Sequence, residues 1–455
     1  MILSLVGLWV IAAKADTVVG KRLFRETRFA QYFYAHSEGV NAPLREGDPV
    51  LASGPYAGKS MNCAQCHLSD ELKDTLGTRA FADFARRSPI PERGDGKRAT
   101  LRNTPGFVNA FISREPRLFL HYDGEFTSVE ELVQGGFTGR NFGWLPAERA
   151  QAIRHIARVV REDDGQGGLP YRSTLGLDVA HVSDVQVLEV VATKVADYLR
   201  TAVAFDSPYD DFLRANELPA QPRTDERDVE YGRALLSRID KIKAPKFVPG
   251  FGAGELKGLK SFLGPANCIA CHAPPAFTDF GFHNTGAAQD EYELLHGGRT
   301  FGKLPIPLKQ GSPELYAAIP EKARPELTDL GLWNAFGEKQ RDWICNDVRA
   351  RTPAPWNVDC TRDGLQPFTV ARFKTPGLRE LVYTGPYLHT GNRGTIDGVV
   401  RFYAKVAIQA RLGLLVNPDP ELASIQTDKE DRDALILLMK ALSSAPPRAD
   451  RASGF

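Results

Sequence analysis

Two copies of one six-residue pattern, NCAQCH at residues 62–67 and NCIACH at residues 267–272, contain four of the six cysteines in this chain. In each copy, two cysteines three positions apart are followed directly by a histidine. Two thiols at this spacing can bond both vinyl groups of one haem, and the adjacent imidazole can ligate its iron. We therefore expect two covalent haems. The residues expected to hold them are Cys63, Cys66, Cys268 and Cys271 as attachment points and His67 and His272 as proximal iron ligands.

The alternatives for these cysteines are a zinc ribbon and a redox-active dithiol. A zinc site would join the two CxxC pairs, but its usual ligand spacing does not place a histidine directly after each second cysteine. With only six cysteines and nine histidines in 455 residues, two such patterns by chance are improbable. Two haems remain the better interpretation.

The N-terminus has features of an export signal. Residues 2–13 form an apolar run that is too short to span a bilayer, and Ala13-Lys14-Ala15 matches an A-x-A-like cleavage site. Because c-type haem is attached outside the bacterial inner membrane, we expect residues 1–15 to be a signal peptide and the mature protein to be periplasmic, without a stable membrane span. A retained anchor is the alternative. In the periplasm Cys345 and Cys360 are expected to form a disulfide, with two free buried thiols as the alternative.

Bulk composition limits the partners. The 57 basic and 56 acidic residues nearly cancel, so no net field favours nucleic acid or an anionic membrane. A length of 455 residues predicts two or three domains, and 41 glycines with 31 prolines indicate many loops.

The haem motifs belong to a longer internal repeat. In both copies Ser128 or Thr395 precedes a helical pattern, as an N-cap residue does. The second copy carries an insertion at about 291–367, and the first copy carries one at about 25–59. The parallel segments are TPGFVNAF (104–111) with TPGLRELV (375–382), and YDGEFTSVEELV (122–133) with HTGNRGTIDGVV (389–400).

These patterns predict a mainly α fold, in which two cytochrome c-like haem domains stand in tandem with long loop insertions. Ser183 is expected to cap one helix between the two copies, and a capped helix at about 427–442 is expected near the end of the chain. The expected order is an N-terminal domain at 16–217, a linker at 218–223, a C-terminal domain at 224–442 and a disordered tail at 443–455.

The motifs together resemble the bacterial di-haem cytochrome c peroxidases and their MauG-type relatives, over nearly the whole mature chain. The resemblance implies a periplasmic protein in which one haem reacts with peroxide and the other relays or stores electrons. The motifs that carry it are RNTP (102–105), YDG (122–124), FTDFGFHNTG (277–286), FKTPGLRE (373–380) and GPYLHTG (385–391).

The same resemblance implies a calcium ion, which in the family lies between the domains. Its ligands there are an asparagine side chain and two backbone carbonyls, and the matching positions are Asn103, Thr384 and Pro386. Hard oxygen ligands suit Ca²⁺. The alternative is that these are ordinary turn residues.

Tyr403 is the expected sixth ligand of the second iron. It shares one helical face with Ile396, Val399 and Val400. A tyrosine on such a face is usually a core residue, but the resemblance places Tyr403 where the peroxidases have an axial methionine and MauG-type enzymes an axial tyrosine. A phenolate would stabilise oxidised iron and lower the potential of this haem.

The first iron is expected to be open. The repeat aligns Gly136 with Tyr403, and glycine has no side chain to ligate a metal. An open iron would bind peroxide or oxygen, whereas a ligand from elsewhere, such as His121 or His36, would block it.

The sequence departs from the peroxidases at the residues that cleave the O–O bond. Leu132 and Phe142 stand where the family has a glutamine and a glutamate, and Gly136 where it has a proline. Tyr122 replaces the tryptophan between the haems and is expected to act as a redox relay. These departures predict inefficient reduction of hydrogen peroxide.

Two functional classes follow. One is a peroxidase-like oxidoreductase that works with a small redox protein or a small-molecule electron donor or acceptor. The other is a non-catalytic electron carrier. The open iron and the large insertions favour the enzyme, whereas the missing acid–base pair favours the carrier. His283 and His389 are expected to bond propionates or carbonyls, and His155 and His181 to lie at the surface.

Overall fold

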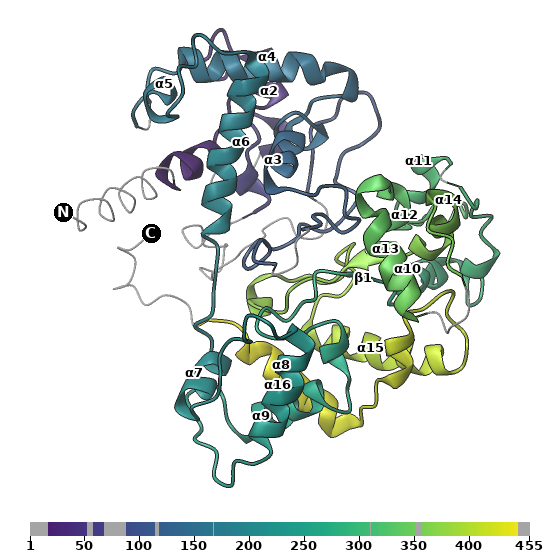
Figure 1. Cartoon of the computed structure of the whole chain (residues 1–455). Helices are drawn as coiled ribbons and strands as arrows, with labels where there is room; N and C mark the ends of the chain where they lie inside the picture. Colours follow the sequence, from purple (N-terminus) through teal and green to yellow (C-terminus); the bar gives the residue numbers. More distant parts are fainter. Residues whose placement is uncertain are drawn as a thin grey trace. The chain divides into compact units, whose positions relative to one another are not determined.

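The computed structural model describes residues 17–51, 58–67, 88–113, 118–166, 168–309, 311–351 and 357–444. It is mostly helical, as predicted, with one small two-stranded sheet among these residues (Figure 1). The predicted signal peptide at 1–15 lies outside the described residues. No helix within the described ranges is long and apolar enough to cross a membrane.

The chain divides into two compact units. The first holds the described residues up to 100 together with 128–203, and the second holds 101–127 and the residues from 204 onward. Residues 101–127 and 204–217, which we expected in the N-terminal domain, therefore group with the C-terminal repeat. Backbone hydrogen bonds join 101–127 to that repeat: the Asn103 N–H donates to the His389 carbonyl at 2.7 Å, and the Lys374 N–H donates to the Tyr122 carbonyl at 2.8 Å.

In the first unit, α6 packs against α3 and α4 (Figure 1). The predicted cap at Ser183 is confirmed, because its hydroxyl accepts from the Gln186 N–H at 3.3 Å and the Gln186 side chain accepts from the Ser183 N–H at 3.0 Å. The buried face of α6 repeats at helical spacing from Val187 to Leu199. Residues 17–24 are also helical. The other helices are α2 (Gln31–His36), α3 (Val129–Phe137), α4 (Arg149–Glu162), α5 (Tyr171–Thr174) and α6 (Asp184–Arg200), with 3₁₀ turns at Pro49–Leu51, Cys63–Gln65, Arg140–Phe142 and Pro146–Glu148.

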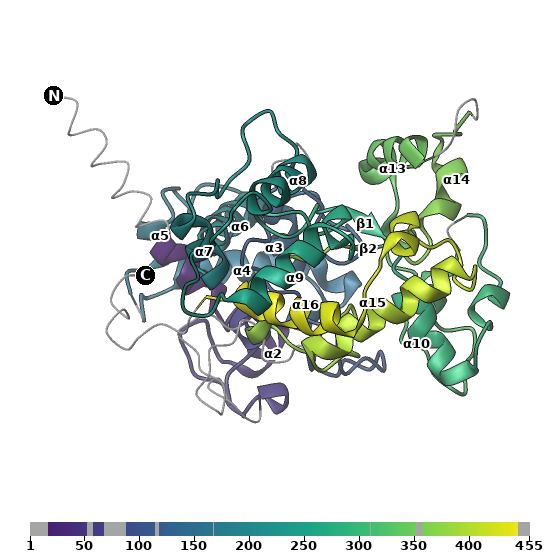
Figure 2. The ribbon, with the colours of Figure 1, turned by 90° about the horizontal axis from the view of Figure 1, so that it is seen from below.

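In the second unit, α9 and α16 lie side by side in both views (Figures 1 and 2). Gly258 permits this contact, since a Cβ there would lie 2.1 Å from the Ala434 carbonyl oxygen. The strands β1 (Phe282–His283) and β2 (Phe373–Lys374) pair antiparallel, with Phe282 opposite Lys374. The helices are α7 (Pro208–Ala215), α8 (Asp228–Ile239), α9 (Ala253–Leu263), α10 (Ala287–His296), α11 (Pro313–Tyr316), α12 (Leu332–Ala335), α13 (Glu338–Arg351), α14 (Arg362–Leu365), α15 (Ile396–Arg411) and α16 (Lys429–Ala441).

The insertion expected at 291–367 packs into the second unit. Its residues Phe336, Ile344 and Leu365 share one buried cluster with Phe119 and Phe282, which lie outside it. The predicted disulfide is confirmed, since Cys345 and Cys360 are bonded with their Cα atoms 5.4 Å apart. The expected disordered tail starts too early: Ser444 is 3% exposed, and its N–H donates to the Glu380 carboxylate at 3.0 Å. Residues 445–455 lie outside the described residues.

Candidate haem centres and calcium site

The two CxxCH motifs adopt the same local geometry, one in each unit. A 3₁₀ turn begins at the first cysteine, and the backbone N–H of the following histidine closes the loop onto that cysteine's carbonyl. This hydrogen bond is 2.9 Å long for His67 and 2.8 Å for His272. None of the four cysteines is part of a disulfide. The donor set and its spacing therefore fit one covalent haem in each unit.

The imidazole of His272 is oriented as an iron ligand requires. Its Nδ1 lies 3.0 Å from the Phe277 carbonyl, so an Nδ1–H donated there leaves the Nε2 lone pair for the metal. Burial lowers the pKa of His272, which keeps the ring neutral. Haem ligation through Nε2 is thus consistent with the local hydrogen bonding.

Helix α15 brings Tyr403 close to the second motif. The helix begins after Thr395, whose hydroxyl accepts from the Gly398 N–H at 3.0 Å as predicted. Burial raises the pKa of Tyr403, and the nearby cysteines of the second motif, Cys271 and Cys268, raise it further. The phenol therefore lies within electrostatic reach of the atoms that would attach the second haem.

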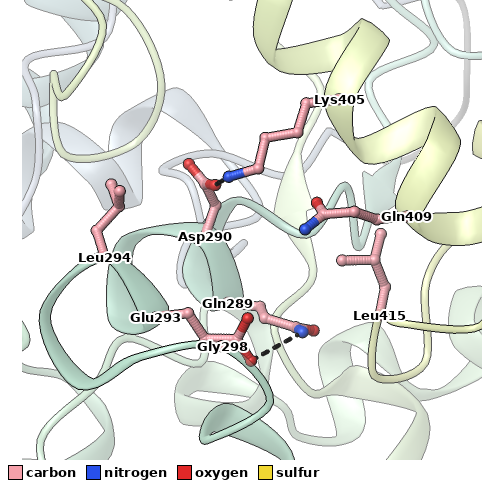
Figure 3. Close-up of a pocket in the computed structure, with 8 residues that line it drawn as sticks. All are labelled: Gln289, Asp290, Glu293, Leu294, Gly298, Lys405, Gln409 and Leu415. Atoms are coloured by element: carbon pink, nitrogen blue, oxygen red, sulfur yellow. Dashed lines mark hydrogen bonds and ion pairs between the residues drawn. The ribbon is translucent and has the colours of Figure 1, made fainter.

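A cavity of about 230 Å³ lies between α10 and α15 (Figure 3). In Figure 3 the Lys405 ammonium reaches the Asp290 carboxylate, and Gln289 donates to Glu293 at 3.1 Å. The Asp290 side chain, which is 2% exposed, also pairs with Arg393, so its charge is neutralised. These contacts tie α10 to the helix that carries Tyr403, and they give the cavity a structural role. It is lined by Gln289, Asp290, Glu293, Leu294, Gly298, Lys405, Gln409 and Leu415.

His283 sits between two carboxylates beside the second motif. Its Nδ1 lies 2.5 Å from Asp419 and its Nε2 lies 2.8 Å from Asp279. Burial alone would lower the pKa of His283, but Cys271 and the two carboxylates raise it well above its usual value. We expected bonds to propionates or carbonyls, and the structure instead shows a buried charged triad. The DxxxH spacing at 279–283 was a local signal for Asp279, whereas nothing in the sequence pointed to Asp419.

The first unit leaves open space at the position that matches Tyr403. Ser128 caps α3, accepting from the Glu131 N–H at 3.0 Å as predicted. A Cβ built at Gly136 meets no atom of the described residues within 4 Å. Phe142 is buried and packs edge-on against Phe137, with ring centroids 5.2 Å apart. Glu130 is turned outward to Arg200, at 2.7 Å.

Four further histidines have identifiable partners: His36, His121, His155 and His181. His36 lies in the first unit, with Nδ1 2.9 Å from the Tyr32 carbonyl. His121 belongs to the second unit and pairs with Glu125 at 3.2 Å. The expectation for His181 is confirmed, since its side chain is 82% exposed. The expectation for His155 is wrong: it is 6% exposed, because it lies on the buried face of α4.

The three expected calcium ligands belong to one unit, the second. The Asn103 Nδ2 donates to the Pro386 carbonyl at 2.7 Å, and the Asn103 Oδ1 is buried without a hydrogen-bond partner among the described residues. A Cβ on Gly106 would touch the Thr384 methyl group at 3.4 Å. A buried amide oxygen without a hydrogen-bond partner fits the hard oxygen ligands of Ca²⁺.

A buried ion-pair network involves Arg102, the residue before Asn103. Arg102 donates to Asp123 at 2.6 Å and, through Nε, to Asp329 at 2.7 Å. Asp329 comes from the insertion, and no sequence signal predicted this pairing. Tyr122, the expected redox relay, packs against the neighbouring core, and burial raises its pKa to about 12. The tyrosine is therefore protonated at neutral pH, so its oxidation would have to release a proton.

Comparisons with known proteins find di-haem cytochrome c peroxidases and MauG as similar proteins. A family model described as di-haem cytochrome c peroxidase matches residues 48–218. Cytochrome-c peroxidase IdrP2 of Denitromonas iodatirespirans is 27% identical over 445 residues, which cover 96% of this chain and 83% of that protein. The methylamine utilization protein MauG of Methylorubrum extorquens is 25% identical over 387 residues, which cover 85% and 74% of the two chains.

A solved structure shares the fold. The diheme peroxidase BthA from Burkholderia thailandensis superposes with a TM-score of 0.52 at 18% identity, covering 95% of this chain and 86% of its own. The family match includes the first CxxCH motif, and the alignment with IdrP2 extends over nearly the whole length. The chain is thus similar over most of its length to relatives named cytochrome-c peroxidase and MauG, and residues 48–218 match the di-haem cytochrome c peroxidase family model.

Proposed function

We propose that this chain is a periplasmic di-haem c-type oxidoreductase that reduces peroxide, or oxidises a partner with it, at the first haem, while the second haem relays electrons. Relatives named cytochrome-c peroxidase and MauG support an enzyme of this kind. The observation that carries the proposal is Gly136, which leaves space where the second repeat has Tyr403. The electron source is a small redox protein or a small molecule.

The residues of each unit would divide the work. When bound, haem supplies a redox-active iron that can accept peroxide at an open position. His67 and His272 would each hold one iron from the proximal side. Tyr403 would close the distal side of the second centre and favour its oxidised state, whereas Gly136 leaves the distal side of the first centre accessible. Chemistry at the first site and storage at the second follow from this difference.

Proton transfer at the first site would be weak. Leu132 and Phe142 carry no ionisable group, and a positioned acid–base residue is typically worth about 10²–10⁴-fold in rate. Restoring the pair with Leu132→Gln and Phe142→Glu is therefore expected to raise peroxide turnover. The control Leu132→Ala should leave turnover near the original value.

Calcium would stiffen the region next to Tyr122. We propose that the Asn103 side chain and the carbonyls of Thr384 and Pro386 bind Ca²⁺, with Tyr122 nearby as a redox relay. Metal analysis should find calcium in the purified protein, and Asn103→Ala should lose it. Chelation should slow electron transfer between the haems. Calcium-free protein with the same transfer rate would contradict the assignment.

Ligand binding distinguishes this enzyme from an electron carrier. Cyanide or CO should bind one haem of the two, and the oxidised protein should show a high-spin EPR signal. The carrier is favoured by the apolar packing of Phe142 against Phe137, which leaves no acid at this position. If neither haem binds cyanide or CO in either redox state, the carrier is correct and the enzyme is not.

A further inference from the structure

An aromatic cluster in the first unit joins a buried tryptophan to an exposed tyrosine. Trp144 is 1% exposed, whereas Tyr34 on α2 is 41% exposed. Their ring centroids are 5.6 Å apart. His155 of α4 packs against both rings, with its centroid 5.9 Å from Trp144 and 5.0 Å from Tyr34. One ring-to-ring contact, between Trp144 and Tyr34, therefore connects the core of the first unit to its surface.

One short backbone stretch, residues 25–29, connects this cluster to the first haem motif. Asn62, next to Cys63, donates its Nδ2 to the Arg25 carbonyl at 3.1 Å, and Trp144 donates its Nε1 to the Phe29 carbonyl at 3.0 Å. Four residues span at most about 14 Å even when fully extended. The Trp144 indole is thus connected to the first haem motif by this short stretch and two hydrogen bonds.

Buried contacts hold that stretch in place. The Arg28 guanidinium pairs with Asp163 at 2.9 Å and with Glu26 at 2.6 Å. The backbone carbonyl oxygen of Arg28 lies 2.7 Å from the His155 Nε2. Asp163 is 0% exposed, and a buried charge that loses its partner is costly. The geometry between motif and cluster is therefore rigid.

The two aromatic groups differ in what happens to their protons. Tryptophan and tyrosine are the side chains most readily oxidised by one electron. The Trp144 N–H faces a weakly basic carbonyl, so an oxidised indole would keep its proton. The Tyr34 oxygen accepts from Gln151 at 2.8 Å and is exposed, so water can take its proton. Burial lowers the pKa of His155, and the neutral ring adds no positive charge beside an indole cation.

We propose that Trp144 and Tyr34 form a one-electron outlet through which the first haem site oxidises small phenols at the protein surface. This inference rests on the proposed function, which supplies peroxide as the oxidant. Trp144 gives one electron to the oxidised site and regains it from Tyr34, which releases its phenolic proton to water. The tyrosyl radical then takes a hydrogen atom from a phenol.

The reaction balances over two cycles. Each transfer removes one electron and one proton from one phenol. Two phenols therefore become two phenoxyl radicals, while one peroxide takes up the two electrons and two protons and becomes two waters. A phenol is the fitting donor because its O–H bond resembles that of tyrosine, which makes the exchange at Tyr34 nearly thermoneutral. The substrate stays at the surface and never needs to reach the buried iron.

The test uses the mature di-haem protein with hydrogen peroxide, tyramine as the phenol and a nitroso spin trap, followed by peptide mass spectrometry. The trap should add to Tyr34. Tyr34→Phe should lose most tyramine oxidation, and Trp144→Phe should lose the adduct on Tyr34 although that tyrosine is still present. Tyr32→Phe is the matched control on the same helix and should change neither. All variants must retain both haems by mass.

The outcomes separate this inference from the proposed function. Peroxide consumption without an adduct on Tyr34, or unchanged tyramine oxidation by Tyr34→Phe, overturns the outlet and leaves the peroxidase assignment intact. An adduct of equal yield in Trp144→Phe also overturns it. A protein that consumes no peroxide and forms no adduct overturns both. Because Tyr34 is exposed, its variant tests the outlet even if Trp144→Phe fails to fold.

Discussion

The two repeats use the same packing device and differ at one position that we propose controls their chemistry. A Cβ on Gly20 would lie 2.0 Å from the Lys194 carbonyl oxygen of α6, and a Cβ on Gly258 would lie 2.1 Å from that of Ala434 of α16. Both glycines thus allow close contact with a long helix of the same unit. Gly136 and Tyr403, in contrast, occupy matching places on α3 and α15 with opposite ligand properties. On the proposed assignment, one scaffold would carry two different iron environments.

Removing one attachment motif should have the largest effect. Cys268→Ala with Cys271→Ala is expected to leave a single covalent haem, because each motif binds its own. Mass spectrometry after denaturation counts the haems. Cys345→Ala with Cys360→Ala is the control and should retain two. Wild-type protein that matures with one haem or none would contradict the doubled motif.

Giving the first centre the tyrosine of the second should make the two irons alike in ligand binding. Gly136→Tyr is expected to abolish cyanide binding at the first haem, because it supplies the ligand that the repeat lacks. Gly136→Ala adds only a methyl group and should still bind cyanide.

Tyr403→His should shift the low-spin EPR signal of the second haem and raise its potential, because imidazole stabilises oxidised iron less than phenolate does. An unchanged EPR spectrum would show that Tyr403 is a core residue and not a ligand of the second iron.

The disulfide stabilises the second unit alone, because the first unit has no cysteines beyond Cys63 and Cys66 of its haem motif. Cys345 and Cys360 are 15 residues apart, and closing a loop of that length is worth about 3 kcal/mol. Cys345→Ala with Cys360→Ala should lower the free energy of unfolding of the second unit by about this amount, measured by urea denaturation. Loss of stability in the first unit would show that the effect is not local.

The glycine contacts predict the smallest effects, with opposite signs. Gly20→Ala and Gly258→Ala should each lower the free energy of unfolding by about 1–3 kcal/mol, because the added methyl group meets backbone. Gly136→Ala should raise it by about 0.5–1 kcal/mol, since its Cβ is unobstructed and alanine favours a helix. Urea denaturation of the three variants tests this. Equal destabilisation by all three would refute the distinction.

Helices with local start signals could be predicted from the sequence. Ser128, Ser183 and Thr395 all cap helices as expected, because a cap depends on residues three positions apart. His155 was mispredicted even though Ala152, Ile156 and Val159 mark its face of α4 as buried. A polar side chain on an apolar face is ambiguous until its partner, here the Arg28 carbonyl, is known.

The boundary between the units could not be found from sequence adjacency. Residues 101–127 follow the first haem motif, yet their backbone bonds reach His389 and Lys374 of the second repeat. Hydrogen bonds between segments so far apart in the sequence form only when the chain has folded. The expected linker at 218–223 also lies inside the second unit, because residues from 204 onward group with that unit through contacts between distant segments.

The sequence by itself determined the two haem motifs, the helix starts and the difference between Gly136 and Tyr403, because these depend on spacing within a few residues or on direct comparison of two repeats. Only the tertiary structure decided which buried charges pair. Asp419 reaches His283 across 136 positions, and Asp329 reaches Arg102 across 227. Burying an ion is unfavourable unless a partner is close, and folding alone determines which distant residue becomes that partner.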